Sequence, residues 1–179
     1  MGTDFIEDAE RIPFSRANIA AVLGIRISLL NNWIDRNRLW QTDRGEKFHR
    51  SYLLSEVFDL AGFGTLRAAR MPEAFCARFV YNYGFYRTFL HGSDQQARFS
   101  YSGKWDLGIY DPGAALTVSI NMRRIGGSIF QGISEAVLAK PASWPAGSFE
   151  SFQKLYCDAL ERDRLEAGSA PKFEADRRA

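Results

Sequence analysis

Gly24 lies between two short amphipathic segments and constrains the fold of this chain more than any other residue. Ser15 is a predicted helix N-cap. The helix that it opens has a buried side made of Ile19, Ala20, Val22 and Leu23. Gly24 stands where this helix must end, and glycine adopts a positive φ there without steric cost. A second helix follows over residues 27–36, so the sequence predicts two helices joined by a tight turn.

The second helix has two chemically different faces. Leu30, Trp33 and Ile34 recur at i, i+3 and i+4 and form one inward stripe. The outer arc is then left with Arg26, Ser28, Asn31, Asn32, Asp35 and Arg36. Asn and Arg are the side chains that make bidentate contacts to adenine and guanine in the major groove. This face is typical of a DNA-reading helix, and the alternative is an ordinary polar face in contact with water.

The segment 40–52 is a predicted charged hairpin that follows this helix. Asn37 is expected to end the helix in a left-handed conformation, and Asp43-Arg44-Gly45 is a turn signal between two short extended pieces. Basic side chains surround the turn, and they suit contacts to phosphates or to a minor groove. They are Arg44, Lys47, His49 and Arg50. A third helix follows from Leu54, interrupted by Gly62 and Gly64, and Pro72 marks a boundary.

In residues 14–70 the chain resembles the winged helix-turn-helix of the MerR and excisionase superfamily. The resemblance rests on Leu23-Gly24-Ile25, on Leu30 and Trp33, on the Arg-Asn-Arg-Leu run at 36–39, and on Arg50 and Tyr52 near the wing. It implies that helix 27–36 enters the major groove and that the wing 40–52 lies along the DNA backbone. The implied contact residues are Arg26, Ser28, Asn31, Asn32, Arg36, Arg38, Arg44, Lys47, His49 and Arg50.

The chain also departs from the family pattern. Asn37 replaces the common glycine, and Asn31 replaces the arginine typical of MerR regulators. No acidic residue clearly opens the helix after the wing. No long heptad helix follows, so the coiled-coil dimerisation arm of MerR regulators is not evident.

The second half predicts a mixed domain. Residues 73–91 have helical spacing, whereas Phe99 to Ile109 and Leu116 to Met122 alternate as strands around an Asp111-Pro112-Gly113 turn. A helix opened by Gly126-Gly127-Ser128 and a last helix from Ser148 complete it. The expected fold class is α+β. It comprises a winged helix-turn-helix at 13–71, an α+β oligomerisation or effector domain with a β-hairpin or small antiparallel sheet at 73–166, and a disordered tail at 167–179.

Composition and motifs exclude several classes of function. The chain has a net charge of only +2 over 179 residues, so it is not a polycation that coats nucleic acid indiscriminately. Cys76 and Cys157 favour buried free thiols, and with His49 and His91 they make no metal-ligand set. No catalytic set and no Walker, Rossmann or zinc motif is present, so we expect no enzyme, no cofactor and no metal. No signal peptide or membrane-spanning run is evident, so a cytoplasmic location is expected.

These observations predict a sequence-specific DNA-binding transcriptional regulator. Its partners would be double-stranded DNA and a second copy of the chain, because two half-sites are the usual route to useful affinity. Residues 73–166 would form the contact between the subunits and respond to a bound ligand or protein. The alternative is a phage or mobile-element accessory protein, excisionase-like or small-terminase-like, that recruits a partner enzyme. A third hypothesis is that the helix-turn-helix is a protein-interaction scaffold without DNA. It fits if binding to mixed duplex shows no salt dependence, because phosphate contacts must release counterions.

Overall fold

A computed structural model describes residues 10–40, 51–82, 84–91, 96–101, 105–106 and 116–169. The described helices are α2 (Arg16–Val22), α3 (Ile27–Arg36), α4 (Leu54–Ala68), α5 (Glu73–Asn82), α6 (Phe85–His91), α7 (Met122–Ala139), the short 3-10 helix η1 (Pro141–Ser143) and α8 (Ser148–Ser169). The strands are β1 (Gln96–Tyr101), β2 (Trp105–Asp106) and β3 (Leu116–Asn121). The predicted mixture of helices with a small antiparallel sheet is confirmed.

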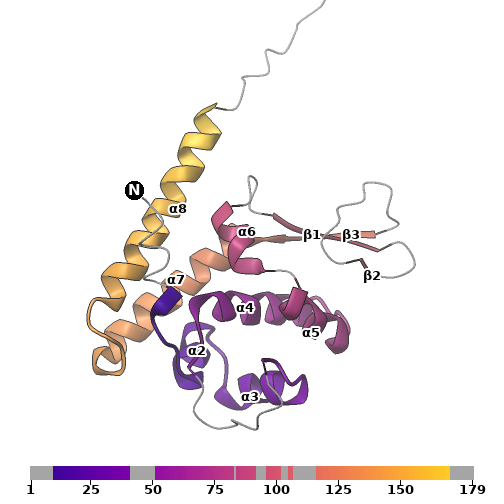
Figure 1. Cartoon of the computed structure of the whole chain (residues 1–179), viewed down its shortest axis with the longest axis horizontal. Helices are drawn as coiled ribbons and strands as arrows, with labels where there is room; N and C mark the ends of the chain where they lie inside the picture. The colour runs from indigo at the N-terminus through magenta and orange to yellow at the C-terminus, as the bar shows by residue number, and fades with distance from the viewer. Residues whose placement is uncertain are drawn as a thin grey trace, which may run out of the picture.

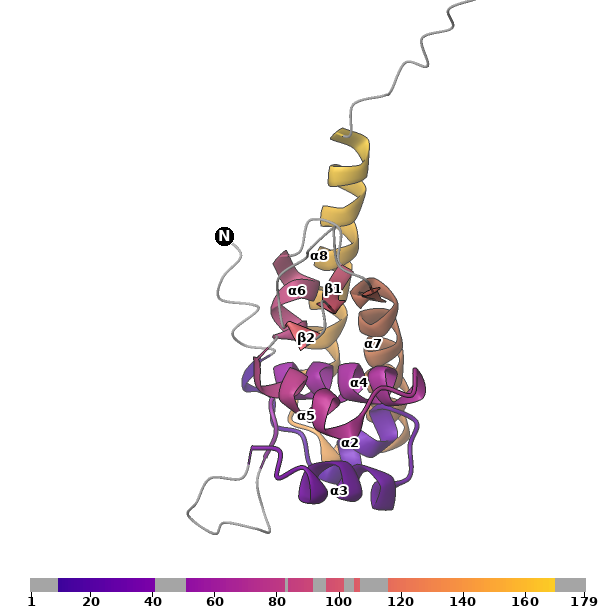
Figure 2. The same ribbon diagram turned by 90° about the vertical axis from the view of Figure 1, so that its right-hand side faces the viewer.

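α4 is the central element of the fold. It crosses the middle of the molecule, with α2 and α3 below it and α6 and the sheet above it, as Figure 1 shows. α4 contacts α5, α6 and α7. The C-terminal end of α8 extends away from the rest of the molecule in both views (Figures 1 and 2).

The first two helices follow the predicted pattern. The Ser15 hydroxyl accepts a hydrogen bond from the backbone N–H of Asn18 and caps α2. Gly24 has a φ of +63°, and the chain turns by 116° between α2 and α3. Asn37 was expected in a left-handed conformation, and that prediction was wrong. Its φ is −92°, while the next residue, Arg38, has a φ of +51°.

α4 corrects the prediction that Gly62 and Gly64 interrupt the third helix, because the helix runs through both. A Cβ on Gly62 would lie 2.7 Å from the Phe85 ring, and one on Gly64 would lie 2.9 Å from the Trp33 ring. Both glycines therefore stand where an aromatic ring packs directly against the helix backbone.

The start of α4 is held by two carboxylates. Glu56, which is 7% exposed, accepts a hydrogen bond from the backbone N–H of Leu53 at 2.9 Å. Glu10 accepts hydrogen bonds from the backbone N–H and the hydroxyl of Ser55. Acidic groups here satisfy free N–H groups and complement the helix dipole. Glu56 is thus the acidic residue that the sequence reading did not find at the opening of this helix.

The aromatic segment 73–91 forms two helices where one was expected. Gly84, with a φ of +65°, separates α5 from α6. Phe79 lies at the centre of this region, with its ring 4.5 Å from Phe75 and 4.0 Å from Phe99, centroid to centroid. The break lets both helices turn aromatic side chains into one core.

The sheet has the strand order β2-β1-β3, and both pairings are antiparallel. β1 pairs with β3 from Gln96–Asn121 to Tyr101–Leu116. The predicted strand from Phe99 to Ile109 is divided into β1 and β2, which pair with each other. The predicted turn at Asp111 to Gly113 lies outside the described residues.

α7 begins at Met122, so the prediction that Gly126-Gly127-Ser128 opens this helix was wrong. Asn121 caps it by accepting a hydrogen bond from the backbone N–H of Arg124 at 2.9 Å. A Cβ on Gly126 would lie 2.3 Å from the Phe89 ring. A Cβ on Gly132 would lie 2.1 Å from the carbonyl oxygen of Val22. Glycines in α7 thus allow α6 and α2 to approach it closely.

The buried residues form one continuous hydrophobic core from Phe14 to Ala159. Trp144, which directly follows η1, is 8% exposed, and its ring centroid lies 5.1 Å from that of Phe14. The core therefore extends across Pro72, the proposed boundary between the two halves. Cys76 is buried as expected, whereas Cys157 is exposed, which corrects its prediction.

α8 begins at Ser148 as predicted and continues to Ser169. The rest of the predicted tail, residues 170–179, lies outside the described part of the chain. Across the described residues, no single helix is both long enough and apolar enough to cross a membrane.

Candidate nucleic-acid interface

α3 is anchored on one side and open on the other. Leu30 and Ile34 are fully buried, and the Trp33 ring packs 5.3 Å from Phe63, centroid to centroid. The predicted inward stripe is therefore confirmed. α3 lies at the lower edge of the molecule in both ribbon views (Figures 1 and 2).

The outer side of α3 carries most of the predicted contact residues. Arg26, Ser28, Asn32 and Arg36 are exposed, and Arg38 is exposed directly after the helix. Among the described residues, the side chains of Arg26, Ser28, Asn32 and Arg36 have no hydrogen-bond or ion-pair partner. They are therefore available to a ligand without breaking an existing contact.

Two large apolar side chains add to this surface and were missed in the sequence reading. Ile27 is 48% exposed and Leu29 is 42% exposed, both in the first turn of α3. Apolar side chains contact the thymine methyl group in the major groove. Leu29 falls outside the stripe of Leu30 and Ile34, so the helical spacing predicts its exposure. Ile27 stands seven residues before Ile34, in register with the stripe, so the spacing does not predict its exposure.

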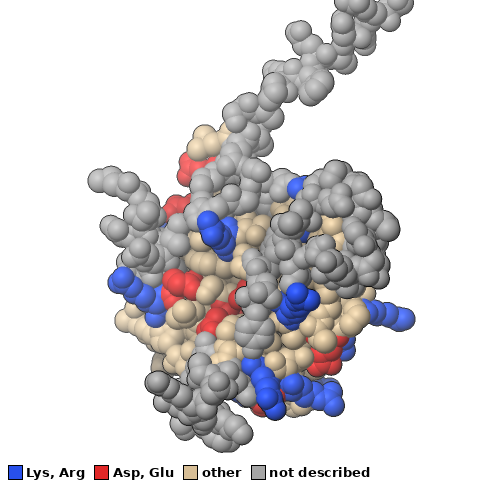
Figure 3. All heavy atoms as spheres, turned by 45° about the vertical axis from the view of Figure 1, so that its right-hand side comes forward, with Lys and Arg blue, Asp and Glu red and all other residues tan. Residues whose placement is uncertain are grey.

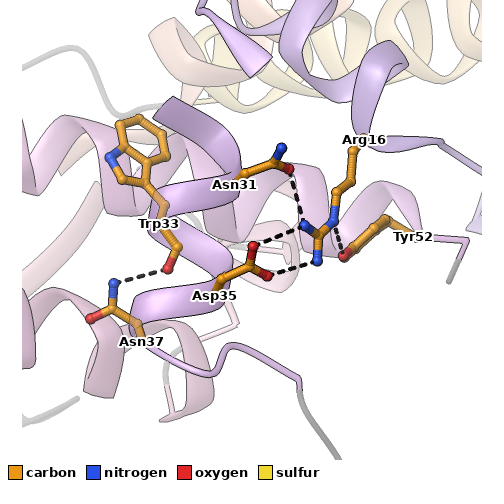
Figure 4. A network of polar contacts seen from close by, with 6 residues as sticks. All are labelled: Arg16, Asn31, Trp33, Asp35, Asn37 and Tyr52. Atoms are coloured by element: carbon orange, nitrogen blue, oxygen red, sulfur yellow. Dashed lines mark hydrogen bonds and ion pairs between the residues drawn. The ribbon is translucent and has the colours of Figure 1, made fainter. Parts of the chain in front are cut away.

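Asn31 differs from its neighbour Asn32, because Asn31 takes part in a network around Arg16 (Figure 4). The Arg16 guanidinium donates to the Asn31 side-chain oxygen at 3.0 Å and to the Tyr52 hydroxyl at 3.1 Å. It also forms an ion pair with Asp35 at 3.1 Å. The network joins the start of α2, the outer face of α3 and Tyr52, the last residue of the predicted wing.

The charge of Arg16 is secured by this network. Partial burial by itself lowers the pKa of the guanidinium. Hydrogen bonds to Asp35 and Tyr52 outweigh that effect, so the pKa of Arg16 is raised above its ordinary value. Arg16 is thus a positioning residue that fixes α3 relative to α2.

Arg16→Met should lower the free energy of unfolding by about 1 kcal/mol, because it removes partly exposed hydrogen bonds and an ion pair while it keeps the apolar stem. Urea denaturation measures this difference. Arg36→Met is the matched control, since Arg36 is exposed and has no partner among the described residues. Equal stability of the two variants would contradict the positioning role.

Asn37 ties the end of α3 to the start of α5. Its side-chain nitrogen donates to the carbonyl oxygen of Trp33 at 2.9 Å and to the Glu73 carboxylate at 3.0 Å. Glu73 also forms an ion pair with Arg67 at 3.9 Å. These contacts depend on the Asn37 side chain, so a glycine at this position would remove them.

The structure describes only the two ends of the predicted wing, Trp40 and residues 51–52. Arg44, Lys47, His49 and Arg50 lie outside the described residues, so their placement stays a prediction. The flanking residues are held in the core. Trp40 and Tyr52 have ring centroids 6.0 Å apart, and Phe14 and Tyr52 exchange backbone hydrogen bonds of 2.8 and 2.9 Å.

Charge on this side of the molecule is mixed but includes several cations. Figure 3 shows Lys and Arg side chains along the lower edge of the molecule, at the height of α3 in Figure 1, with acidic side chains among them. Of the acidic residues nearby, Asp35 is paired with Arg16 and Glu73 with Arg67. The unpartnered charges on the outer side of α3 itself are therefore Arg26 and Arg36, as far as the described residues show.

Comparison with known proteins identifies no relative of this chain. It matches no family model, no curated protein and no solved structure.

Proposed function

We propose that residues 13–71 form a winged helix-turn-helix, similar to those of the MerR and excisionase superfamily, and that the protein is a sequence-specific DNA-binding regulator. The observation that carries this proposal is the outer face of α3. Asn32 is exposed there, has no hydrogen-bond partner within the described part of the chain, and lies along the helix from Arg26 and Arg36. The 116° turn through Gly24 agrees with the 90–120° angle between the helices of this motif.

α3 is suited in size to a DNA groove. An α-helix with its side chains is about 10–12 Å across, and the major groove is roughly 12 Å wide. The 10 residues of α3 would place about 15 Å of helix in the groove. In this arrangement Asn32 reads a base edge, most simply adenine, while Arg26 and Arg36 contact phosphates at the two ends of the helix. The hairpin 40–52 would follow the backbone with Arg44, Lys47, His49 and Arg50.

A dimer completes the proposal. One helix of this length reaches a few base pairs, and two symmetric copies on two half-sites bring specific binding into a useful range. The C-terminal half, residues 73–166, would supply the contact between subunits.

The salt dependence of binding tests the phosphate contacts. We expect Arg26→Gln with Arg36→Gln to reduce the slope of log K against log salt by about two, because each lost phosphate contact removes about 0.9 from the slope. Fluorescence anisotropy with a labelled duplex, repeated from low to physiological salt, gives the slope.

Arg87→Gln is the matched control for this experiment. Arg87 is exposed on α6, above α4, whereas α3 lies below α4 (Figure 1). Its slope should equal that of the wild-type protein. An unchanged slope in the double variant would show that α3 does not contact the DNA. Binding without salt dependence would overturn the proposed DNA partner.

A further inference from the structure

A groove lies between α7 and α8, away from the face of α3. It encloses about 510 Å³, which is within the usual range for small-molecule sites. α7 and α8 lie side by side along its length (Figure 1). The two helices provide all of its lining residues.

The floor of the groove is aromatic and apolar. Phe130 and Tyr156 stack with a centroid distance of 5.1 Å and an interplanar angle of 26°. Ile133 and Phe152 are each 1% exposed and close the bottom, while Phe149 is half-buried at the side. This surface suits a flat ring system, which would extend the existing stack.

The rim of the groove is polar and carries one cation without a counter-charge. Arg124 is exposed, and its guanidinium has no hydrogen-bond or ion-pair partner in the described part of the chain. The same holds for the side chains of Ser128, Gln153 and Tyr156, which also line the groove. Donors and acceptors thus converge on the space above the aromatic floor without satisfying one another.

The position of Arg124 favours an anion still further. The first turn of α7 contains no acidic residue, although the positive end of the helix dipole lies there. A cation in this turn is electrostatically unfavourable unless a negative group joins it. The guanidinium fork is suited to a carboxylate, sulfonate or phosphate.

We propose that the groove between α7 and α8 is a binding site for a small aromatic anion, with its ring on Phe130 and Tyr156 and its acidic group on Arg124. The site is independent of the proposed DNA interface and can be tested without DNA. Gly132, which contacts Val22 of α2, lies on α7 between Gln131 and Ile133 of the groove. A ligand in the groove would therefore touch the helix that also supports α2.

The probe is 1-anilinonaphthalene-8-sulfonate, an aromatic sulfonate whose fluorescence rises on transfer to an apolar site. We expect saturable binding of one molecule per full-length chain. 1-Naphthoate should displace the probe, and 1-naphthalenemethanol, which has the same ring system without the charge, should do so at least about tenfold more weakly.

Arg124→Gln should weaken probe binding about tenfold, whereas Arg123→Gln, a neighbouring exposed arginine that does not line the groove, should leave it within twofold. Ser128→Trp, which fills the groove, should abolish binding. Circular dichroism confirms that each variant is folded. Equal affinity of the Arg124→Gln variant, equal displacement by the alcohol, or non-saturable binding would overturn the proposal. It would also be overturned if the probe were excluded at concentrations where sedimentation shows a dimer, because a second copy would then be the occupant.

Discussion

Gly132→Ala should lower the free energy of unfolding by about 3 kcal/mol. The added Cβ would lie 2.1 Å from the carbonyl oxygen of Val22, 2.9 Å from its carbonyl carbon and 3.0 Å from its Cα. All three atoms belong to the backbone of α2, so no side-chain rotation relieves the contact. The helices must separate, and Tm should fall by roughly 6–12 °C in a chain of this length.

Gly127→Ala is the matched control in the same helix. The nearest atom to its added Cβ would be the Tyr156 hydroxyl oxygen at 3.4 Å, at the end of a side chain. Alanine is favoured over glycine inside a helix by about 1 kcal/mol, so this variant should be as stable as the wild type or more stable. Thermal unfolding of both variants measures the difference in Tm between them. A Gly132→Ala protein as stable as Gly127→Ala would show that α2 and α7 do not pack as described.

The second large effect concerns Asp59, whose carboxylate lies between α4 and α6. Its Oδ1 is enclosed and has no hydrogen-bond partner among the described residues, although the side chain as a whole is partly exposed. Burial raises the pKa of Asp59 from an ordinary 3.8 to about 7. A hydrogen bond from the backbone N–H of Phe85 opposes the shift, and the charges of Glu56 and Glu10 add to it.

The raised pKa makes stability depend on pH in a defined direction. The folded protein holds the Asp59 proton more tightly than the unfolded chain, so the contribution of this group is fully present below about pH 4 and is lost as the pH rises through about 7. The difference of about three pKa units sets an upper limit of roughly 4 kcal/mol.

Asp59→Asn should therefore raise the free energy of unfolding at pH 8, by on the order of 2–4 kcal/mol, and the two proteins should converge toward pH 4. Urea denaturation between pH 4 and pH 8 gives both curves. Glu161→Gln, an exposed position on α8, should leave the curve unchanged. Parallel wild-type and Asp59→Asn curves would contradict a buried, reluctantly ionised carboxylate.

The sequence correctly predicted the elements whose ends are set by neighbouring residues, such as a helix cap or a glycine turn. Ser15 as a cap, Gly24 as a turn, and the bounds of α3 at Ile27 and Arg36 all follow from propensity and helical spacing. The predictions failed at Gly62, Gly64 and Gly126. Each of these glycines lies inside a helix because an aromatic ring from another element packs against it. Such a contact between distant residues has no signal in the local sequence. The glycine alone therefore predicts a break in the helix.

The same distinction applies to the candidate site. The exposure of Ser28, Asn32 and Arg36 followed from the spacing of the buried stripe. The role of Arg16 did not, because its partners Asn31, Asp35 and Tyr52 are brought to it only by the turn at Gly24 and the return of the chain at Phe14. The structure thereby separates two adjacent asparagines that looked equivalent in the sequence. Asn31 is held in a network, while Asn32 is free among the described residues.

This difference between Asn31 and Asn32 provides the most direct test of the proposed function. The full-length wild type and the single variants Asn32→Ala and Asn31→Ala would each be used to select duplexes from a random library, followed by affinity measurements on the selected sites. The wild type should enrich a defined motif. Asn32→Ala should lose the preference at one base pair, with a specific affinity lower by about 1–3 kcal/mol and unchanged non-specific binding. Asn31→Ala should keep the motif. Absence of an enriched motif, or the same motif at the same affinity with Asn32→Ala, would contradict the proposal that α3 reads DNA.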